Sequence, residues 1–161
     1  MNNSVVILFH NAINFVIDLV DIVLWRKDVL NNMNLIVGIQ GQAQTTVSEL
    51  NTAKAMGSGT LEVFATPAMV ALMEQASVNA LNLPSGQSSV GTSLSIMHTA
   101  ATPIGSKVYA TAKLIEIDRR RLIFSVEVRD EVGQIGSGRH ERVVIDVESF
   151  ITKSQNRSLE T

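Results

Sequence analysis

Residues 66–82 read TPAMVALMEQASVNALN, and this stretch is the strongest indication of a helix after Ile36. Thr66 suits the N-cap position, and Pro67 suits the first helical position, where its missing N–H is harmless. Apolar side chains lie on nearly every side of this helix, so we expect other structure to cover it. Proline and glycine in LPSG at 83–86 are expected to end it.

The segments around this helix alternate between apolar and polar residues, which is the pattern of half-buried strands. We predict strands at 90–98, 108–114, 122–128 and 135–147, and an earlier strand within 36–49. Short polar segments between the later strands have the composition of turns. One apolar helix before a run of antiparallel strands predicts an α+β fold in which a curled sheet wraps the helix.

The composition excludes several classes of protein. The 161 residues, 45% of them hydrophobic, suffice for one domain, and a net charge of −2 gives no general basic field for nucleic acid. The absence of cysteine excludes disulfides and thiolate zinc sites and fits a reducing compartment, so we expect the cytoplasm. With three histidines, no metal-binding spacing and no phosphate-binding glycine loop, we expect neither a metal ion nor a cofactor.

The first 33 residues differ from the rest of the chain. Ser4–Trp25 is mostly aliphatic and long enough for a marginal membrane span, but Asp18 and Asp21 would be costly inside a bilayer. Three interpretations stay open: a membrane anchor, a helix packed on the domain or a partner, and an extension upstream of a true start at Met33. We expect a helical extension at 1–33, the domain at 34–153 and a flexible polar tail at 154–161.

Three side chains in the predicted core region are candidates for chemistry. His98 is either a core histidine or an imidazole that faces a cleft, where it suits proton transfer. Glu74 either occupies a wet edge of the helix or serves as a nucleophile or general base. Thr66 is either a cap or a hydroxyl beside an oxyanion at the helix start. Thr66 and Glu74 are about 12 Å apart along the helix axis, so a shared site requires an elongated substrate or a second subunit.

Two other groups carry weaker signals. His140 lies within GSGRHERVV, where alternating charges are typical of solvated or cross-strand positions on an edge strand. Arg119, Arg120 and Arg121 form a basic turn that is most simply a hydrated one, although it could meet a phosphate. We expect neither His140 nor the three arginines to take part in catalysis or binding.

Four blocks of sequence together resemble the hotdog-fold thioesterases typified by the fluoroacetyl-CoA thioesterase. They are VFATPAMVALMEQAS (63–77), SSVGTSLSIMHTAATPIG (88–105), RRRLIFSVEVRDEVGQIGSG (119–138) and HERVVID (140–146). The resemblance spans roughly 63–153. It implies an antiparallel sheet of about five strands around one helix, homodimers joined edge to edge, and an acyl-CoA site at the dimer interface. Pairing of such dimers into tetramers stays open.

The resemblance also implies roles for four residues. Thr66 would position the substrate, Glu74 would act as nucleophile or as base for water, and His98 would deliver protons to the departing thiol. The backbone of Gly91 would meet the acyl carbonyl. The implied reaction is hydrolysis of an acyl-CoA thioester to a free acid and CoA, with no metal and no cofactor.

One departure from the family concerns the acyl group. Fluoroacetyl-specific members carry phenylalanines in a lid just before the helix, whereas residues 50–63, LNTAKAMGSGTLEV, contain no aromatic residue. We therefore expect a small or medium acyl group rather than fluoroacetyl selectivity. The alternative is a non-catalytic acyl-CoA binding or sensing module on the same scaffold. A hydratase would require an aspartate and histidine dyad, which these motifs do not contain.

Overall fold

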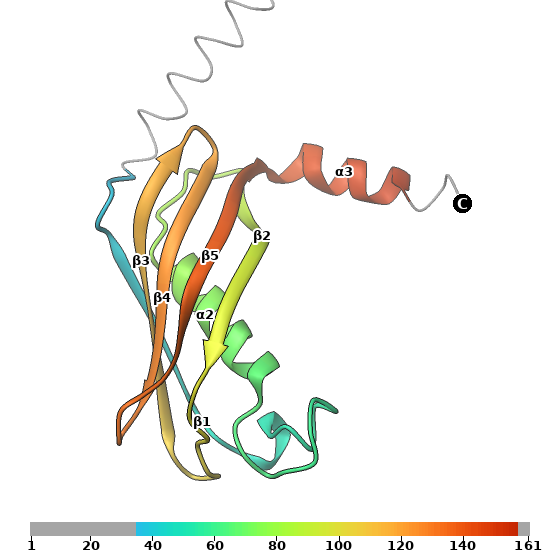
Figure 1. The fold of residues 1–161 in the computed structure, drawn as a ribbon. Helices are drawn as coiled ribbons and strands as arrows, with labels where there is room; N and C mark the ends of the chain where they lie inside the picture. The colour runs from blue at the N-terminus through green and yellow to red at the C-terminus, as the bar shows by residue number, and fades with distance from the viewer. Residues whose placement is uncertain (1–34, 158–161) are drawn as a thin grey trace, which may run out of the picture. The chain divides into compact units, whose positions relative to one another are not determined.

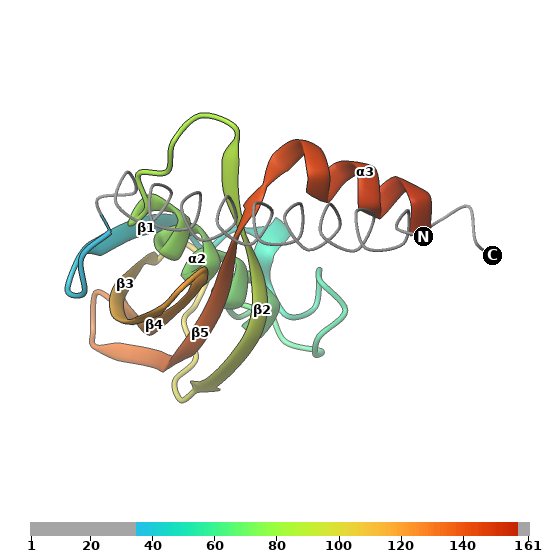
Figure 2. The ribbon, with the colours of Figure 1, turned by 90° about the horizontal axis from the view of Figure 1, so that it is seen from above.

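A computed structural model describes residues 35–157 and contains one five-stranded antiparallel sheet with a helix on its concave side (Figure 1). The strand order is β1-β3-β4-β5-β2. Seen from above, the sheet curls around α2 (Figure 2), which confirms the predicted α+β class and the predicted number of strands. The elements in chain order are β1 (Gln40–Thr46), the 3-10 helix η1 (Glu49–Asn51), α2 (Thr66–Asn79), β2 (Gln87–His98), β3 (Lys107–Asp118), β4 (Arg121–Asp130), β5 (Gln134–Asp146) and α3 (Val147–Arg157).

The core forms where one face of α2 meets the inner face of the sheet. Met69 and Met73 of the helix are fully buried, and the sheet contributes alternate residues of β3 and β4, which confirms the period-two prediction. Gly41 of β1 allows the closest approach, because a Cβ there would lie 2.2 Å from the carbonyl oxygen of Ala76. This tight packing of β1 fixes the position of α2 against the sheet.

Helix α2 differs from the prediction at both ends and on one face. It ends at Asn79 rather than at residue 82, and Ala65, not Thr66, is the N-cap, with no side-chain hydrogen bond. The expectation that other structure covers most sides of the helix and buries it is met on one face only, because Met69 and Met73 are buried whereas Val78 is 46% exposed. One helix lying on one sheet buries one face against it.

The order of the strands corrects the prediction for His140. Strand β5 pairs with both β4 and β2, so it is an interior strand, and the edges of the sheet are β1 and β2. Consequently His140 is buried rather than solvated. The order of strands in a sheet depends on long-range pairing, which local charge alternation does not report.

The structure describes part of the predicted tail but none of the predicted extension. The extension at 1–33 lies outside the described residues. Residues 154–157 belong to α3, although the sequence predicts a flexible tail there, and the carboxylate of Asp146 accepts a hydrogen bond from the backbone N–H of Ser149 at the start of this helix. Between residues 35 and 157 no helix is both long enough and apolar enough to cross a bilayer.

A buried hydrogen-bond cluster secures the loop that follows β2. The carboxylate of Asp130 accepts hydrogen bonds from the Thr102 hydroxyl at 2.9 Å and from the backbone N–H groups of Val132 and Gly133 at 2.8 and 3.0 Å. Burial alone would raise the pKa of Asp130, but these hydrogen bonds outweigh it and hold the pKa below its usual value. The cluster therefore stabilises the fold when Asp130 is ionised.

We predict that Asp130→Ala lowers the free energy of unfolding by about 2 kcal/mol or more at neutral pH, since it removes hydrogen bonds to a buried charge. Because the folded-state pKa is depressed, this contribution is present above the unfolded-state pKa and is lost as the pH falls through the folded-state value. Urea unfolding of Asp130→Ala and of Glu131→Ala, an exposed neighbour, measures the difference. Equal effects of the two substitutions would contradict the prediction.

Candidate active site

The hydroxyl of Thr66 and the imidazole of His98 are in direct contact. Thr66 is the first residue of α2 and His98 is the last of β2, and the distance from Thr66 Oγ1 to His98 Nδ1 is 2.9 Å. His98 Nε2 is buried and has no hydrogen-bond partner among the described residues. The Thr66 hydroxyl therefore orients an imidazole whose second nitrogen is left for another group, instead of capping the helix.

The carboxylate of Glu74 lies two turns further along α2 and faces two buried basic side chains. Its Oε1 atom is 3.8 Å from His140 Nε2 and 3.8 Å from Arg142 Nη1, and the Glu74 side chain is 44% exposed. Glu74 thus lies on a wet edge of the helix and also faces a positive charge, and its role as nucleophile or general base stays a prediction. A half-exposed carboxylate beside a fixed cation is suited to nucleophilic or general-base work.

Gly91 brings the backbone of β2 against this carboxylate. A Cβ at Gly91 would lie 2.6 Å from Glu74 Oε1 and 3.0 Å from His140 Cε1, so a larger residue would displace one of them. The pairing of β2 with β5 shifts register between Gly91 and Ser93, as at a β-bulge. Glycine at this position keeps the space in front of Glu74 open.

The sequence does not predict that two buried polar residues, His140 and Arg142, lie beside Glu74. His140 is 1% exposed and Arg142 is 5% exposed, and both point to the inner side of β5. His140 Nδ1 donates to the carbonyl of Ser93 at 3.0 Å, and Arg142 donates from Nη1 to His140 Nε2 at 3.0 Å. Period-two continuation from the buried Val144 would have placed both side chains on the core face, but their charge suggested solvent instead.

The predicted site residues form two clusters along β2, one at its last residue and one nearer its middle. Thr66 and His98 make up the first cluster, and Glu74 with Gly91 makes up the second. At about 3.3 Å per residue the strand separates His98 from Gly91 by about 20 Å. Within one chain the three predicted catalytic side chains therefore do not converge.

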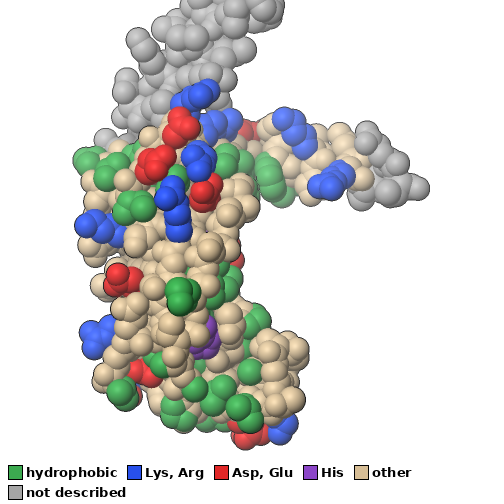
Figure 3. All heavy atoms as spheres, viewed as in Figure 1, with side chains coloured by type: hydrophobic (Ala, Val, Ile, Leu, Met, Phe, Trp, Pro, Cys, Tyr) green, Lys and Arg blue, Asp and Glu red, His purple; other side chains and the backbone are tan. Residues whose placement is uncertain are grey.

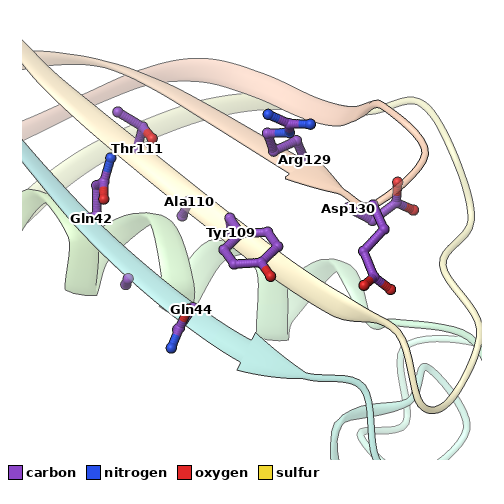
Figure 4. A pocket seen from close by; sticks show the side chains of 9 residues that line it. Gln42, Gln44, Tyr109, Ala110, Thr111, Arg129 and Asp130 are labelled. Atoms are coloured by element: carbon purple, nitrogen blue, oxygen red, sulfur yellow. The ribbon is translucent and has the colours of Figure 1, made fainter.

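One hollow in the surface is not lined by any residue of the two clusters. This hollow, of about 660 Å³, lies over β1, β3 and β4 and is lined by Gln42, Gln44, Tyr109 and Arg129 among others (Figure 4). Its polar side chains project outward from the sheet, and none of the predicted site residues lines it.

Among residues 35–157 no group of three His, Asp or Glu side chains could hold a metal ion.

The arginines of the β3–β4 turn belong to a surface network of ion pairs. Arg121 donates two hydrogen bonds of 2.9 Å to Glu141, and Arg119 lies 3.5 Å from Asp118. Figure 3 shows positive and negative side chains intermingled at this end of the molecule. Neighbouring carboxylates thus balance this basic turn, which gives an incoming phosphate little excess positive charge.

Comparison with known proteins agrees with this architecture. The sequence model described as fluoroacetyl-CoA-specific thioesterase matches residues 47–148. The fluoroacetyl-CoA thioesterase of Streptantibioticus cattleyicolor is 48% identical over 99 residues, which cover 60% of this chain and 71% of that protein.

Solved structures give the same result. A structure of the fluoroacetyl-CoA thioesterase matches with a TM-score of 0.72 and 39% identity, covering 76% of this chain and 97% of that chain. A hot-dog-like protein from Thermanaerovibrio acidaminovorans matches with a TM-score of 0.69 and 27% identity, covering 75% and 91%. The curled sheet, the enclosed helix and these similarities agree with the resemblance found in the sequence. The chain belongs to the fluoroacetyl-CoA-specific thioesterase family and has its hotdog fold.

Proposed function

We propose that two copies of this chain form an acyl-CoA thioesterase whose Thr66, Glu74 and His98 meet at the dimer interface. The observation that carries the proposal is that Thr66 lies with His98 at the end of an edge strand, whereas Glu74 lies beside Gly91, seven residues earlier on the same strand. Antiparallel pairing of β2 with its copy brings opposite ends of the strand together. A two-fold axis near Ser95 sets His98 of one protomer across from the Gly91 region of the other.

The exposure of β2 supports this mode of pairing. Among the described strands, β2 is one of two edges, and none of its twelve residues is fully buried in the single chain. Met97 near its end is 67% exposed. An exposed strand edge with an apolar side chain is a template for pairing with another strand, and a second copy would satisfy its free backbone groups.

The proposed reaction divides among the residues as follows. The thioester carbonyl lies against the open backbone at Gly91, and the Thr66 hydroxyl orients it. Glu74 either attacks the carbonyl carbon or removes a proton from the attacking water; in both routes the C–S bond breaks and water supplies the oxygen of the acid. His98 transfers a proton from Nε2 to the departing CoA sulfur.

The segment before α2 supports a small or medium acyl group. A bridge between Thr52 and Phe64 closes this segment into a loop, in which Met56 and Leu61 are exposed. The large apolar side chains exposed in this segment, Leu50, Met56 and Leu61, are not aromatic, and no aromatic residue lies between Leu50 and Val63. Flexible aliphatic side chains leave room for more than a two-carbon acyl group.

We predict that Glu74→Gln lowers kcat at least about 100-fold on every acyl-CoA that the unmodified protein hydrolyses, because the amide cannot act as a nucleophile or base. Release of free CoA, followed with a thiol reagent, measures the rate, and the absence of cysteine keeps the background low. Glu127→Gln, an exposed carboxylate on β4, is the matched control and keeps full activity. Unchanged turnover in Glu74→Gln would remove this role.

A panel of acyl-CoAs tests the substrate class. We expect kcat/KM to rise from acetyl-CoA to butyryl-CoA, because each buried methylene adds about 0.8 kcal/mol of binding, and we expect no strong preference for fluoroacetyl-CoA. Leu61→Phe, which adds aromatic bulk to the lid, shifts the optimum to shorter chains, whereas Val132→Phe in the exposed β4–β5 turn does not. Saturable binding of every ester without CoA release would instead favour the non-catalytic binding module.

A further inference from the structure

Arg142 is a buried cation with an unusual set of partners. Its Nε donates to the Ser89 hydroxyl at 2.9 Å, its Nη2 donates to the Ser89 carbonyl at 2.7 Å, and its Nη1 donates to His140 Nε2 at 3.0 Å. The carboxylate that faces this guanidinium belongs to Glu74, at 3.8 Å from Nη1. This distance exceeds that of a hydrogen bond, so the two groups attract each other without sharing a proton.

The neighbours of His140 determine its protonation. The Ser93 carbonyl can only accept, so Nδ1 carries the proton, and Arg142 can only donate, so Nε2 is the bare acceptor. Protonation of Nε2 would set an N–H against the N–H of a guanidinium. Burial also lowers the pKa of His140; the hydrogen bond to Ser93 raises it, the Arg142 charge lowers it and Glu74 raises it least, so that the pKa lies below its usual value.

Apart from Ser93 and Arg142, the residues that face His140 are apolar ones of β4 and β2 and the carboxylate of Glu74. Strand β4 presents Phe124 at the position paired with His140, β2 presents Leu94 at the paired position on the other side, and α2 presents Glu74. Among the described residues, Arg142 and Glu74 are the charged groups that act on this imidazole. His140 thus links Arg142 to the backbone of β2 in one fixed orientation.

We propose that His140 is a positioning residue that, as the neutral Nδ1–H tautomer, keeps Arg142 from closing onto the Glu74 carboxylate. Engagement of Nη1 by His140 holds the positive charge near Glu74 while leaving the lone pairs of Oε1 free for the reaction. Without this acceptor, Nη1 turns to Glu74 and forms a direct ion pair that occupies the reactive oxygen. This inference rests on the proposed role of Glu74.

Two substitutions separate the two hydrogen bonds of His140. His140→Gln retains an acceptor near the position of Nε2, toward Arg142, and gives up the bond to Ser93. His140→Asn retains a donor near the position of Nδ1, toward Ser93, and gives up the bond to Arg142. We expect His140→Asn to lower kcat about 10- to 100-fold with KM changed less than about two-fold, and His140→Gln to keep most of the activity.

The opposite order of the two variants, or equal losses at equal thermal stability, would overturn the inference. A loss confined to KM would also overturn it, because the acceptor would then serve binding. If Glu74→Gln retains turnover, the proposed function itself fails. If Glu74→Gln is inactive while the two His140 variants behave alike, only the role of His140 fails.

The tautomer of His140 can be measured in the unmodified protein, so the inference can be tested even if the variants do not fold. Long-range proton–nitrogen correlation spectra of the nitrogen-15-labelled full chain distinguish the two nitrogens of each imidazole. We expect the proton of His140 on Nδ1 at neutral pH, and a titration midpoint below that of an ordinary histidine, because burial lowers the pKa of this imidazole. A proton on Nε2, or a midpoint at or above the ordinary histidine value, would contradict the proposal.

Discussion

The unpaired backbone edge of β2 is the constraint on which the proposed site depends. An edge strand leaves a row of N–H and C=O groups that only another strand can satisfy in full. Because β2 carries His98 at its end and Gly91 seven residues earlier, pairing with a copy of itself would have a chemical consequence as well as a structural one. In the proposed dimer, the contact that covers the edge would bring Glu74 of one protomer toward Thr66 and His98 of its partner.

Helix α2 sets the spacing of the remaining groups. Thr66 and Glu74 belong to one rigid helix, and Gly41 lets that helix lie directly on the backbone of β1. Met69 and Met73 are buried on the same face of the helix and hold its rotation, so Glu74 faces β2 and β5. Chemistry at this site therefore depends on packing some distance away, since a rotation of α2 would misalign both ends of the helix at once.

The sequence predicts a large part of this structure because local periodicity reports it. The strands around 108–114 and 122–128 and the helix from Thr66 follow from alternation and from proline at the helix start. The motif resemblance then selects Thr66, Glu74, His98 and Gly91, and the contacts of Thr66 with His98 and of Gly91 with Glu74 agree with that selection.

What the sequence does not predict depends on the order of strands and on long-range contacts. His140 and Arg142 have the charge pattern of a solvated edge, yet β5 lies between β4 and β2 and buries them. The hydroxyl of Thr66 suits a helix cap, yet it forms a hydrogen bond with His98, 32 residues later in the sequence. In each case the deciding partner is distant in sequence, so no local pattern carries the information.

The central claim is that each site combines Glu74 of one chain with Thr66 and His98 of the other, and a mixed dimer tests it directly. Glu74→Gln and His98→Ala chains, co-expressed with different affinity tags, yield heterodimers after two purification steps. If the site is shared, each heterodimer has one intact site and one doubly altered site, and it recovers about half of the unmodified activity per dimer. If all three residues act within one chain, both sites are defective, and a heterodimer no more active than either parent would contradict the account.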